Sequence, residues 1–344
     1  MQKKTIAVIF GGCSTEYEVS LQSAFSVLDN LNPEKYTVIP VGITRQGDWY
    51  RYYGDYSKIP ADAWAQDRND LVRIAVSSSH SVRGLIEMRN TGNCVVQLDM
   101  VFPVLHGKNG EDGTVQGLFE LAGIPVIGCG TLASALCMDK DRAHKLVQAS
   151  GVTVPKSVSL HQGDDVDVSG LKYPLFVKPV RSGSSFGITK VYLPEDLREA
   201  VTLAFKHDNT VIIEENVDGF EVGCAVMGID ELTVGRVDEI ELSHGFFDYT
   251  EKYTLKTSKI HMPARIDVAT EKRIQETAKL IYRALGCSGF ARVDMFLRPD
   301  GEIVFNEVNT IPGFTSHSRY PNMMKGIGLS FPEMLDKLIG LYTL

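Results

Sequence analysis

The sequence contains no uninterrupted apolar segment of about 18 residues, the length that a membrane-spanning helix requires. The apolar residues 6–10 near its start are too few for the core of a signal peptide, and Gly11-Gly12 ends them. A buried first strand is the better interpretation. We therefore expect a cytoplasmic protein that does not associate with a membrane.

The sequence also lacks closely spaced pairs of cysteines and a cluster of basic residues. The six cysteines are scattered along 344 residues without a CxxC pair, which favours reduced thiols over a disulfide framework or a zinc site. The formal net charge is −8, and no cluster of Lys and Arg is present to neutralise a phosphate backbone. No nucleic-acid partner is expected.

The chain has the composition of a soluble globular protein, with 44% hydrophobic and 23% charged residues. It is too long for one core, so two or three domains are expected. The GxGxxG pattern of dinucleotide-binding folds is absent from the first glycine turn, which argues against a Rossmann oxidoreductase. Repeats and low-complexity segments are absent too.

The order of apolar segments predicts an open α/β layer at the N-terminus. A strand at 6–10, a helix that begins at Ser14 and a strand at 37–43 follow in βαβ order. Residues 45–95 are polar and mixed, and we interpret them as an insertion of unassigned role. Further strands are predicted at 100–105, 125–128, 174–179, 211–215, 221–228, 232–240, 289–297 and 302–306, and helices at 114–122, 132–150, 195–205 and 269–285.

Polar residues alternate with apolar ones along the last two predicted strands. Arg292 and Asp294 flank Val293, and Glu307 and Asn309 occupy one face of the partner strand. Two carboxylates and an amide oxygen without Cys or His suit a hard cation such as Mg²⁺. A solvated hairpin with surface ion pairs is the alternative, but the intervening residues are too apolar for an exposed face.

Two small-residue loops have the features of anion sites. Lys178 precedes the loop 181–187, whose Gly and Ser residues can present N–H groups to phosphates. Gly11-Gly12 leads into a helix N-terminus with Glu16 in its first turn, where the carboxylate either complements the helix dipole or binds a substrate ammonium. Alone, the loop 181–187 is better explained as an ordinary flexible loop. Glu214 and Glu221 after an apolar strand are candidates for adenine and ribose contacts or for surface roles.

Taken together, these segments resemble the D-alanine–D-alanine ligase family, which has the ATP-grasp fold. The resemblance covers nearly the whole chain, in ordered blocks at 11–20, 106–113, 138–140, 178–185, 252–253, 306–313 and 315–318. It implies an N-terminal open α/β domain over 1–128, followed by two α+β ATP-grasp subdomains over 129–215 and 216–344. A homodimer is the family expectation.

The resemblance implies a role for each matching residue. Glu16 would hold the ammonium of the first D-alanine with His106 nearby, and Glu16, Ser184 and Tyr253 would form a hydrogen-bonded triad. Ser318 would bind the carboxylate of the second substrate. Arg292 and the Gly313 N–H would stabilise the tetrahedral intermediate. Asp294, Glu307 and Asn309 would bind two Mg²⁺, with Mn²⁺ as a possible substitute. ATP would be held by Lys140, Lys178, Ser184, Ser185, Glu214, Glu221, Lys252 and the backbone of Glu215 and Val217.

The implied chemistry proceeds through an acyl phosphate. The carboxylate of D-alanine attacks the γ-phosphate of ATP, and the amine of the second substrate then displaces phosphate. Water would destroy the intermediate, so a closing lid is needed. The polar, aromatic-rich segment at about 244–260 is the candidate lid. The sequence does not identify the base for the amine.

Two positions bear on the second substrate. Relatives that make the D-alanyl-D-lactate ester carry a histidine where this chain keeps Lys252-Tyr253, so an amino-acid acceptor is expected. Arg319 stands where ordinary D-alanine–D-alanine ligases have Leu or Met, and its donors can reach a serine hydroxyl beside Phe247. The chain is thus similar to the vancomycin-resistance D-alanine–D-serine ligases, whose product lowers the affinity of peptidoglycan precursors for vancomycin.

Three alternatives stay open. Arg319 can instead point to solvent or pair with an acid. The closest alternative is a housekeeping D-alanine–D-alanine ligase with an unusual Arg319. A different ligase of the ATP-grasp fold is less compatible with Glu16, Ser184 and Tyr253. A catalytically inactive ATP-binding regulator is the alternative from another class, and the set Asp294, Glu307, Asn309 and Arg292 argues against it.

Overall fold

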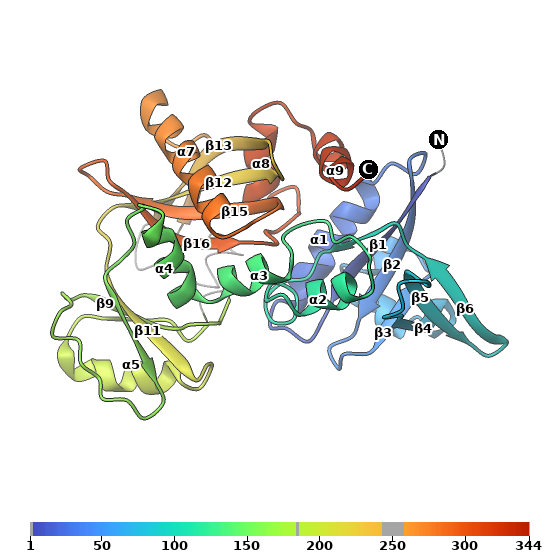
Figure 1. Cartoon of the computed structure of the whole chain (residues 1–344), viewed down its shortest axis with the longest axis horizontal. Coiled ribbons are helices and arrows are strands. Elements are labelled where there is room, and N and C mark those ends of the chain that lie inside the picture. The colour runs from blue at the N-terminus through green and yellow to red at the C-terminus, as the bar shows by residue number, and fades with distance from the viewer. Residues whose placement is uncertain (1–2, 184–185, 243–257, 344) are drawn as a thin grey trace.

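Three β-sheets form the framework of the computed structural model, which describes residues 3–183, 186–242 and 258–343 (Figure 1). In Figure 1 the N-terminal sheet lies on the right, the C-terminal sheet at the upper left and the central sheet separately at the lower left. Helices α3 (Thr131–Met138) and α4 (Lys140–Ala149) lie between the N-terminal sheet and the other two. Both termini lie at the same corner of the molecule.

The N-terminal sheet begins with the predicted βαβ unit. Strand β1 (Lys4–Gly11) pairs in parallel with β2 (Tyr36–Ile43) and β7 (Met100–Pro103), and α1 (Tyr17–Asn30) connects β1 to β2. Gly11 has a positive φ of 87°, and a Cβ there would lie 2.2 Å from the Ile43 carbonyl oxygen. This turn therefore requires glycine. Helix α2 (Thr114–Leu121) follows the glycine loop.

Residues 45–95, which the sequence left unassigned, extend this sheet by an antiparallel meander. The full strand order is β6-β5-β4-β3-β2-β1-β7. The added elements are β3 (Trp49–Tyr52), β4 (Leu71–Val76), β5 (Gly84–Arg89) and β6 (Gly92–Gln97), with 3₁₀ turns η1 (Tyr56–Lys58), η2 (Ala63–Gln66) and η3 (Arg68–Asp70). Trp64 from this segment is fully buried against Phe10, so the segment is part of the N-terminal core.

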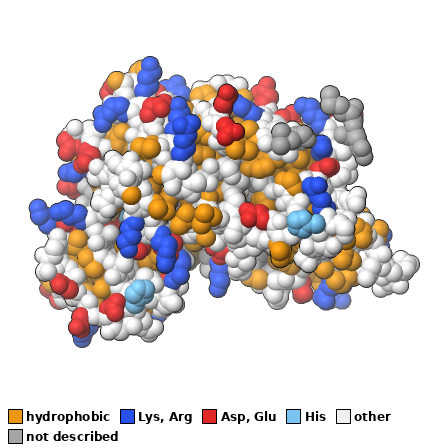
Figure 2. Space-filling view, viewed as in Figure 1, with side chains coloured by type: hydrophobic (Ala, Val, Ile, Leu, Met, Phe, Trp, Pro, Cys, Tyr) orange, Lys and Arg blue, Asp and Glu red, His pale blue; other side chains and the backbone are white. Residues whose placement is uncertain are grey.

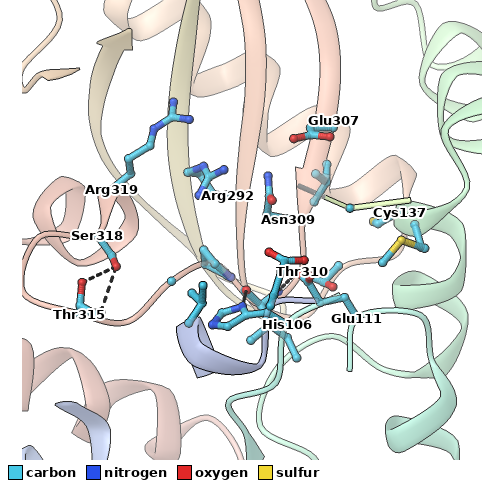
Figure 3. A pocket seen from close by; sticks show the side chains of 18 of the residues that line it. His106, Glu111, Cys137, Arg292, Glu307, Asn309, Thr310, Thr315, Ser318 and Arg319 are labelled. Carbon is cyan, nitrogen blue, oxygen red and sulfur yellow. Dashed lines mark hydrogen bonds between the residues drawn. The ribbon is translucent and has the colours of Figure 1, made fainter. Parts of the chain in front are cut away.

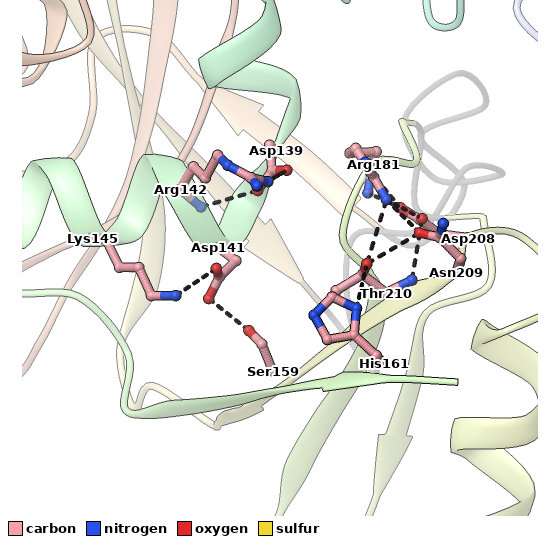
Figure 4. Close-up of polar contacts among 10 residues, drawn as sticks. All are labelled: Asp139, Asp141, Arg142, Lys145, Ser159, His161, Arg181, Asp208, Asn209 and Thr210. Carbon is pink, nitrogen blue, oxygen red and sulfur yellow. Dashed lines mark hydrogen bonds and ion pairs between the residues drawn. The ribbon is translucent and has the colours of Figure 1, made fainter. Parts of the chain in front are cut away.

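Two sequence predictions in the middle of the chain need correction. The helix predicted over 132–150 is two helices, because Asp139 adopts an extended conformation and its side chain accepts a hydrogen bond from the Arg142 N–H, capping α4 (Figure 4). The strand predicted at 125–128 is reduced to a single bridge between Val101 and Val126.

The central sheet is antiparallel, in the order β10-β9-β11-β8. Helix α5 (Leu197–Ala204) covers one face and places Leu197, Ala200 and Val201 in its core. The strands are β8 (Ser157–His161), β9 (Leu175–Pro179), β10 (Thr189–Val191) and β11 (Thr210–Glu215), with the 3₁₀ turn η4 (Pro194–Asp196) before α5.

The C-terminal sheet is also antiparallel, in the order β14-β13-β12-β15-β16. Its strands are β12 (Phe220–Gly228), β13 (Leu232–Leu242), β14 (Ser258–His261), β15 (Gly289–Leu297) and β16 (Ile303–Asn309), and its helices are α7 (Val268–Ala284), α8 (Arg319–Lys325) and α9 (Phe331–Gly340). The predicted hairpin is confirmed by the pairing of β15 with β16. The predicted lid lies mostly outside the described residues, and its last residues belong to β14.

The N-terminal and C-terminal sheets share one hydrophobic core. Phe102 of β7 contacts Phe290 of β15 and Phe314 with ring centroids 5.9 and 5.7 Å apart. Residues of α1, α8 and α9 join the same cluster. The loops between these elements therefore meet at a fixed junction. Among the described residues, no helix combines the length and apolar character needed to cross a membrane. Acidic and basic side chains are interspersed on the face shown in Figure 2.

Candidate active site

A cavity of about 450 Å³ opens at this junction (Figure 3). It is lined by α1 and the residue before it, the glycine loop after β7, the α3–α4 junction, and the chain from β16 to the start of α8. It brings together nine of the residues that the sequence singled out: Glu16, His106, Lys140, Arg292, Glu307, Asn309, Gly313, Ser318 and Arg319. Of the remaining candidates, Ser184, Ser185, Phe247, Lys252 and Tyr253 lie outside the described residues.

Glu16 lies where two glycine loops approach each other. A Cβ on Gly107 would lie 2.8 Å from Glu16 Oε2, and a Cβ on Gly183 would lie 3.1 Å from the same oxygen. Gly107 also has a positive φ of 70°. Both loops need small residues at these points because the carboxylate occupies the space between them. The carboxylate is thus directed into the cavity rather than capping α1, with which it forms no side-chain hydrogen bond.

His106 lines the cavity, but its ring nitrogens bond protein atoms. Nδ1 lies 3.0 Å from the Ile311 carbonyl oxygen, and Nε2 lies 3.2 Å from Ser23 Oγ. Burial lowers the pKa of His106, although the nearby Glu16 charge opposes this effect. This neutral imidazole bridges α1 and the turn after β16. His106 lines the same cavity as Glu16, and its predicted part in substrate binding stays a prediction.

Glu111 is a site residue that the sequence analysis did not identify. Its carboxylate accepts hydrogen bonds from the Gly107 N–H at 2.7 Å and the Ile311 N–H at 3.3 Å. Burial, with the charges of Glu16 and then Glu307 adding to it, raises the pKa of Glu111 to about 8. Its place in the glycine-rich loop was the available signal, but its partner is 200 residues away in the sequence.

Arg292 and Asp294 form a buried ion pair on β15. Arg292 Nε and Nη2 donate to the Asp294 carboxylate at 2.8 and 2.6 Å, and Asn309 Nδ2 donates to it at 2.9 Å. Burial acts to lower the pKa of Arg292, but the charge and hydrogen bonds of Asp294, with the charge of Asp238, together raise it. As predicted from the alternation, Val293 and Met295 are buried on the opposite face.

The oxygen donors near this pair fit a hard cation. Asp294 and Glu307 lie opposite each other in the β15–β16 register, and Arg292 lies opposite Asn309. The part of the chain that the structure describes has no cluster of three or more Asp, Glu, His or Cys residues arranged around a metal position. The two facing carboxylates of Asp294 and Glu307 are of the kind that Mg²⁺ binds, because this ion uses one or two carboxylates and completes its shell with waters and substrate phosphates. Asp294 would exchange one of its present hydrogen bonds for the cation.

A second group of predicted residues lies on the central sheet. Lys178 of β9 and Glu214 of β11 pair at 2.6 Å, and His144 Nδ1 of α4 lies 3.6 Å from the other Glu214 oxygen. Burial acts to raise the pKa of the Glu214 carboxyl, but the charge and hydrogen bond of Lys178, with the charges of His144 and Lys140, together lower it. These residues do not line the cavity, although Lys140 does, and its Nζ donates to the Ser182 carbonyl at 2.9 Å. Glu215 ends the same strand, and Val217 follows it half-buried.

Residues 181–187 form the loop whose Ser182 carbonyl accepts the hydrogen bond from Lys140. Its first residue, Arg181, is held in place by several hydrogen bonds. Arg181 Nη2 bonds Asp208 at 2.7 Å and Asn209 at 2.6 Å, and its backbone N–H donates to the same aspartate (Figure 4). This fixes the first residue of the small-residue loop against the end of α5. The Ser184-Ser185 segment that follows is outside the described residues.

Ser318 caps a tight turn at the other end of the cavity. Its Oγ accepts a hydrogen bond from the Thr315 N–H at 3.0 Å and lies 2.8 Å from Thr315 Oγ1 (Figure 3). A Cβ on Gly313 would lie 2.8 Å from the same Oγ. Gly313 and Ser318 are therefore neighbours, as expected if both face one substrate.

Arg319 shows the acid pairing that the sequence analysis left open. Nε and Nη2 donate to Asp238 of β13 at 2.7 and 2.8 Å, Nη1 donates to Glu221 at 3.0 Å, and Nη2 lies 3.4 Å from Asp294. Only 9% of Arg319 is exposed. Burial disfavours its charge, but Asp238 and Asp294 raise its pKa. A Cβ on Gly223 would lie 2.3 Å from Nη2, so this glycine makes room for the network.

Comparison with known proteins identifies the family. The protein-family model described as "D-ala D-ala ligase N-terminus" matches residues 5–129, and the family model "D-ala D-ala ligase C-terminus" matches residues 146–340. The chain belongs to the D-alanine–D-alanine ligase family. This confirms the resemblance seen in the sequence, and the structural neighbours of this family confirm the ATP-grasp fold.

Three relatives of this chain illustrate the range of activities named within the family. The vancomycin B-type resistance protein VanB of Enterococcus faecalis is 47% identical, covering 99% of both chains. A putative D-alanine–D-lactate ligase of Streptomyces coelicolor is 47% identical, covering 99% of this chain and 98% of the other. The crystal structure of the VanG D-Ala:D-Ser ligase from Enterococcus faecalis is 66% identical with a TM-score of 0.94, covering 99% of this chain and 100% of that one.

Proposed function

We propose that this ligase joins D-alanine to D-serine in an ATP- and Mg²⁺-dependent reaction, yielding a dipeptide for peptidoglycan precursors with lowered affinity for vancomycin. The observation that carries the acceptor assignment is Arg319, a buried cation at the wall of the cavity beside Ser318. The likeness to a solved D-Ala:D-Ser ligase supports it.

The chemistry has two steps. A carboxylate oxygen of D-alanine attacks the γ-phosphorus of ATP, the bond to the β,γ-bridging oxygen breaks, and ADP leaves. The D-serine amine then attacks the acyl carbon, a proton is lost from nitrogen, and the carbon–oxygen bond breaks to release phosphate. A bound Mg²⁺ would neutralise phosphate charge, and Asp294, Glu307 and Asn309 are the residues suited to hold it.

The chain's own groups provide binding and orientation. Glu16 faces the space between the two glycine loops and would bind the ammonium of D-alanine. Lys140 and Lys178 would bind phosphate oxygens of ATP. Arg292 and the Gly313 N–H would stabilise negative charge on the carbonyl oxygen as the amine attacks. The predicted roles of Ser184, Phe247, Lys252 and Tyr253 stay predictions.

The pairing of Arg319 refines the acceptor hypothesis. Its hydrogen bonds to Asp238 and Glu221 use three of the five N–H groups of a guanidinium, and Nη2 also lies 3.4 Å from Asp294. The second N–H of Nη1 remains, and the ion pairs hold it in a fixed orientation. This favours discrimination because a buried donor left without a partner is unfavourable. A serine hydroxyl would accept from this N–H directly or through a water, whereas the methyl group of D-alanine would not.

The test is to supply Mg-ATP, D-alanine and D-serine to the purified chain, and to follow phosphate release and the masses of the dipeptides. D-alanyl-D-serine as the main product at neutral pH is expected. Mostly D-alanyl-D-alanine would favour the housekeeping alternative. ATP binding without phosphate release would favour the inactive regulator and would overturn the proposal.

A further inference from the structure

The backbone turn between β16 and α8 is held by three side chains of the N-terminal part of the chain. Glu111 Oε1 accepts from the Ile311 N–H at 3.3 Å, His106 Nδ1 bonds the Ile311 carbonyl at 3.0 Å, and Ser23 Oγ accepts from the Phe314 N–H at 3.2 Å. Both polar groups of Ile311 and the N–H of Phe314 are therefore fixed from outside the turn. Gly313 lies between these anchored residues in the chain and lines the cavity.

The donors and acceptors of this cluster fit one arrangement. A carbonyl oxygen only accepts, so His106 Nδ1 carries the hydrogen that bonds Ile311. Nε2 is then an acceptor, and Ser23 Oγ donates its hydrogen to it at 3.2 Å. The Ser23 oxygen still accepts from the Phe314 N–H. Ser23 and His106 are 0% and 4% exposed, so water does not compete for these bonds.

Glu111 ties the turn to the glycine loop as well. Its second oxygen accepts from the Gly107 N–H at 2.7 Å, next to the position where Gly107 closely approaches Glu16. One carboxylate thus sets the spacing between the loop that borders the donor ammonium site and the turn that carries Gly313. Both oxygens can accept these bonds even when the carboxyl is protonated, because the O–H oxygen keeps a lone pair. A carboxamide in its place would direct an NH₂ group at one of the two N–H donors.

We propose that Ser23, His106 and Glu111 are positioning residues that hold residues 311–314 so that the Gly313 N–H points at the oxyanion of the tetrahedral intermediate. This inference rests on the proposed function, because the turn has an oxyanion to bind only in acyl transfer. The three side chains act through the backbone and need not touch substrate.

Glu111→Gln tests the proposal, with Glu120→Gln as a matched control. Glu120 also accepts a backbone N–H, that of Thr131 at 2.8 Å, but its carboxylate is exposed and bonds no residue of the turn. We expect Glu111→Gln to lower kcat by about 10- to 100-fold, as a small misplacement of a reacting group does, with the KM for ATP nearly unchanged. ADP release should exceed dipeptide formation, because acyl phosphate would be hydrolysed. Glu120→Gln should match the wild type in both readouts.

A second pair of variants separates positioning from stability. Asn places an amide nitrogen near the position of Nδ1, so His106→Asn keeps the donor to Ile311, whereas His106→Leu removes it. We expect His106→Asn to retain most of the wild-type kcat and His106→Leu to lose most of it. A folded Glu111→Gln enzyme with wild-type kcat and coupling, or equal losses in the two His106 variants, would overturn the proposal; if Glu111→Gln does not fold, the His106 pair decides. Absence of dipeptide with the wild type would instead overturn the proposed function.

Discussion

The buried charges around Arg319 make a strong prediction about substitution at this residue. Arg319→Met keeps the aliphatic stem and removes the guanidinium, leaving Asp238, which is 0% exposed, with the Gly223 N–H at 3.1 Å as its remaining hydrogen bond among the described residues. Breaking a buried ion pair on one side lowers stability by about 3–5 kcal/mol. We expect a loss of this size in the free energy of unfolding.

The double variant Arg319→Met/Asp238→Asn should recover most of that loss. The carboxamide that replaces the Asp238 carboxylate would carry no charge and would still accept from the Gly223 N–H, so no uncompensated charge would be buried there. Because removal of both partners of a buried pair is often nearly neutral, we expect the double variant to be more stable than Arg319→Met by about 1–3 kcal/mol.

Urea unfolding followed by circular dichroism measures these differences. Arg265→Met is the matched control, because Arg265 pairs with the neighbouring Glu239 but is 51% exposed. Such a pair contributes about 1 kcal/mol or less. The reasoning is refuted if Arg319→Met is as stable as the control, or if the losses of the two single variants simply add in the double variant.

Three further predictions follow from the remaining charged groups. Glu214→Gln should raise the KM for ATP by about 10- to 100-fold, because Lys178 loses its charged partner. This factor corresponds to the free energy of a hydrogen bond to a charged group. Steady-state kinetics measures the KM, and an unchanged value would contradict the prediction. Glu307→Gln should raise the Mg²⁺ concentration for half-maximal activity by at least about tenfold, as measured by Mg²⁺ titration. The raised pKa of Glu111 means that the folded state keeps a proton that the unfolded state releases, so stability should fall as pH rises from 4.5 to about 8, and Glu111→Gln should lack this slope in unfolding experiments.

The sequence predicted most accurately what depends on local pattern. The βαβ start follows from an apolar strand, a glycine turn and helical spacing, and the β15–β16 hairpin follows from alternation. The same alternation placed Arg292 and Asp294 on one face with Glu307 and Asn309, because side chains in paired strands obey a two-residue period.

What the sequence missed depends on contacts between distant residues. The partners of Arg319 and His106 lie 81 and 205 residues away, so no local pattern reveals that both side chains are already engaged. The break at Asp139 was hidden because apolar residues continue at helical spacing on both sides of it. The meander at 49–97 was unreadable because its edge strand β6 is largely exposed and lacks alternation.

The acceptor specificity is tested most directly by the ratio of kcat/KM for D-serine to that for D-alanine. We predict a ratio above one for the wild type and for Arg265→Met. In Arg319→Met/Asp238→Asn, loss of one hydroxyl contact should lower the ratio by about 5- to 150-fold, equivalent to about 1–3 kcal/mol. A ratio that is the same in the wild type and the double variant would contradict the assignment of Arg319 to D-serine recognition.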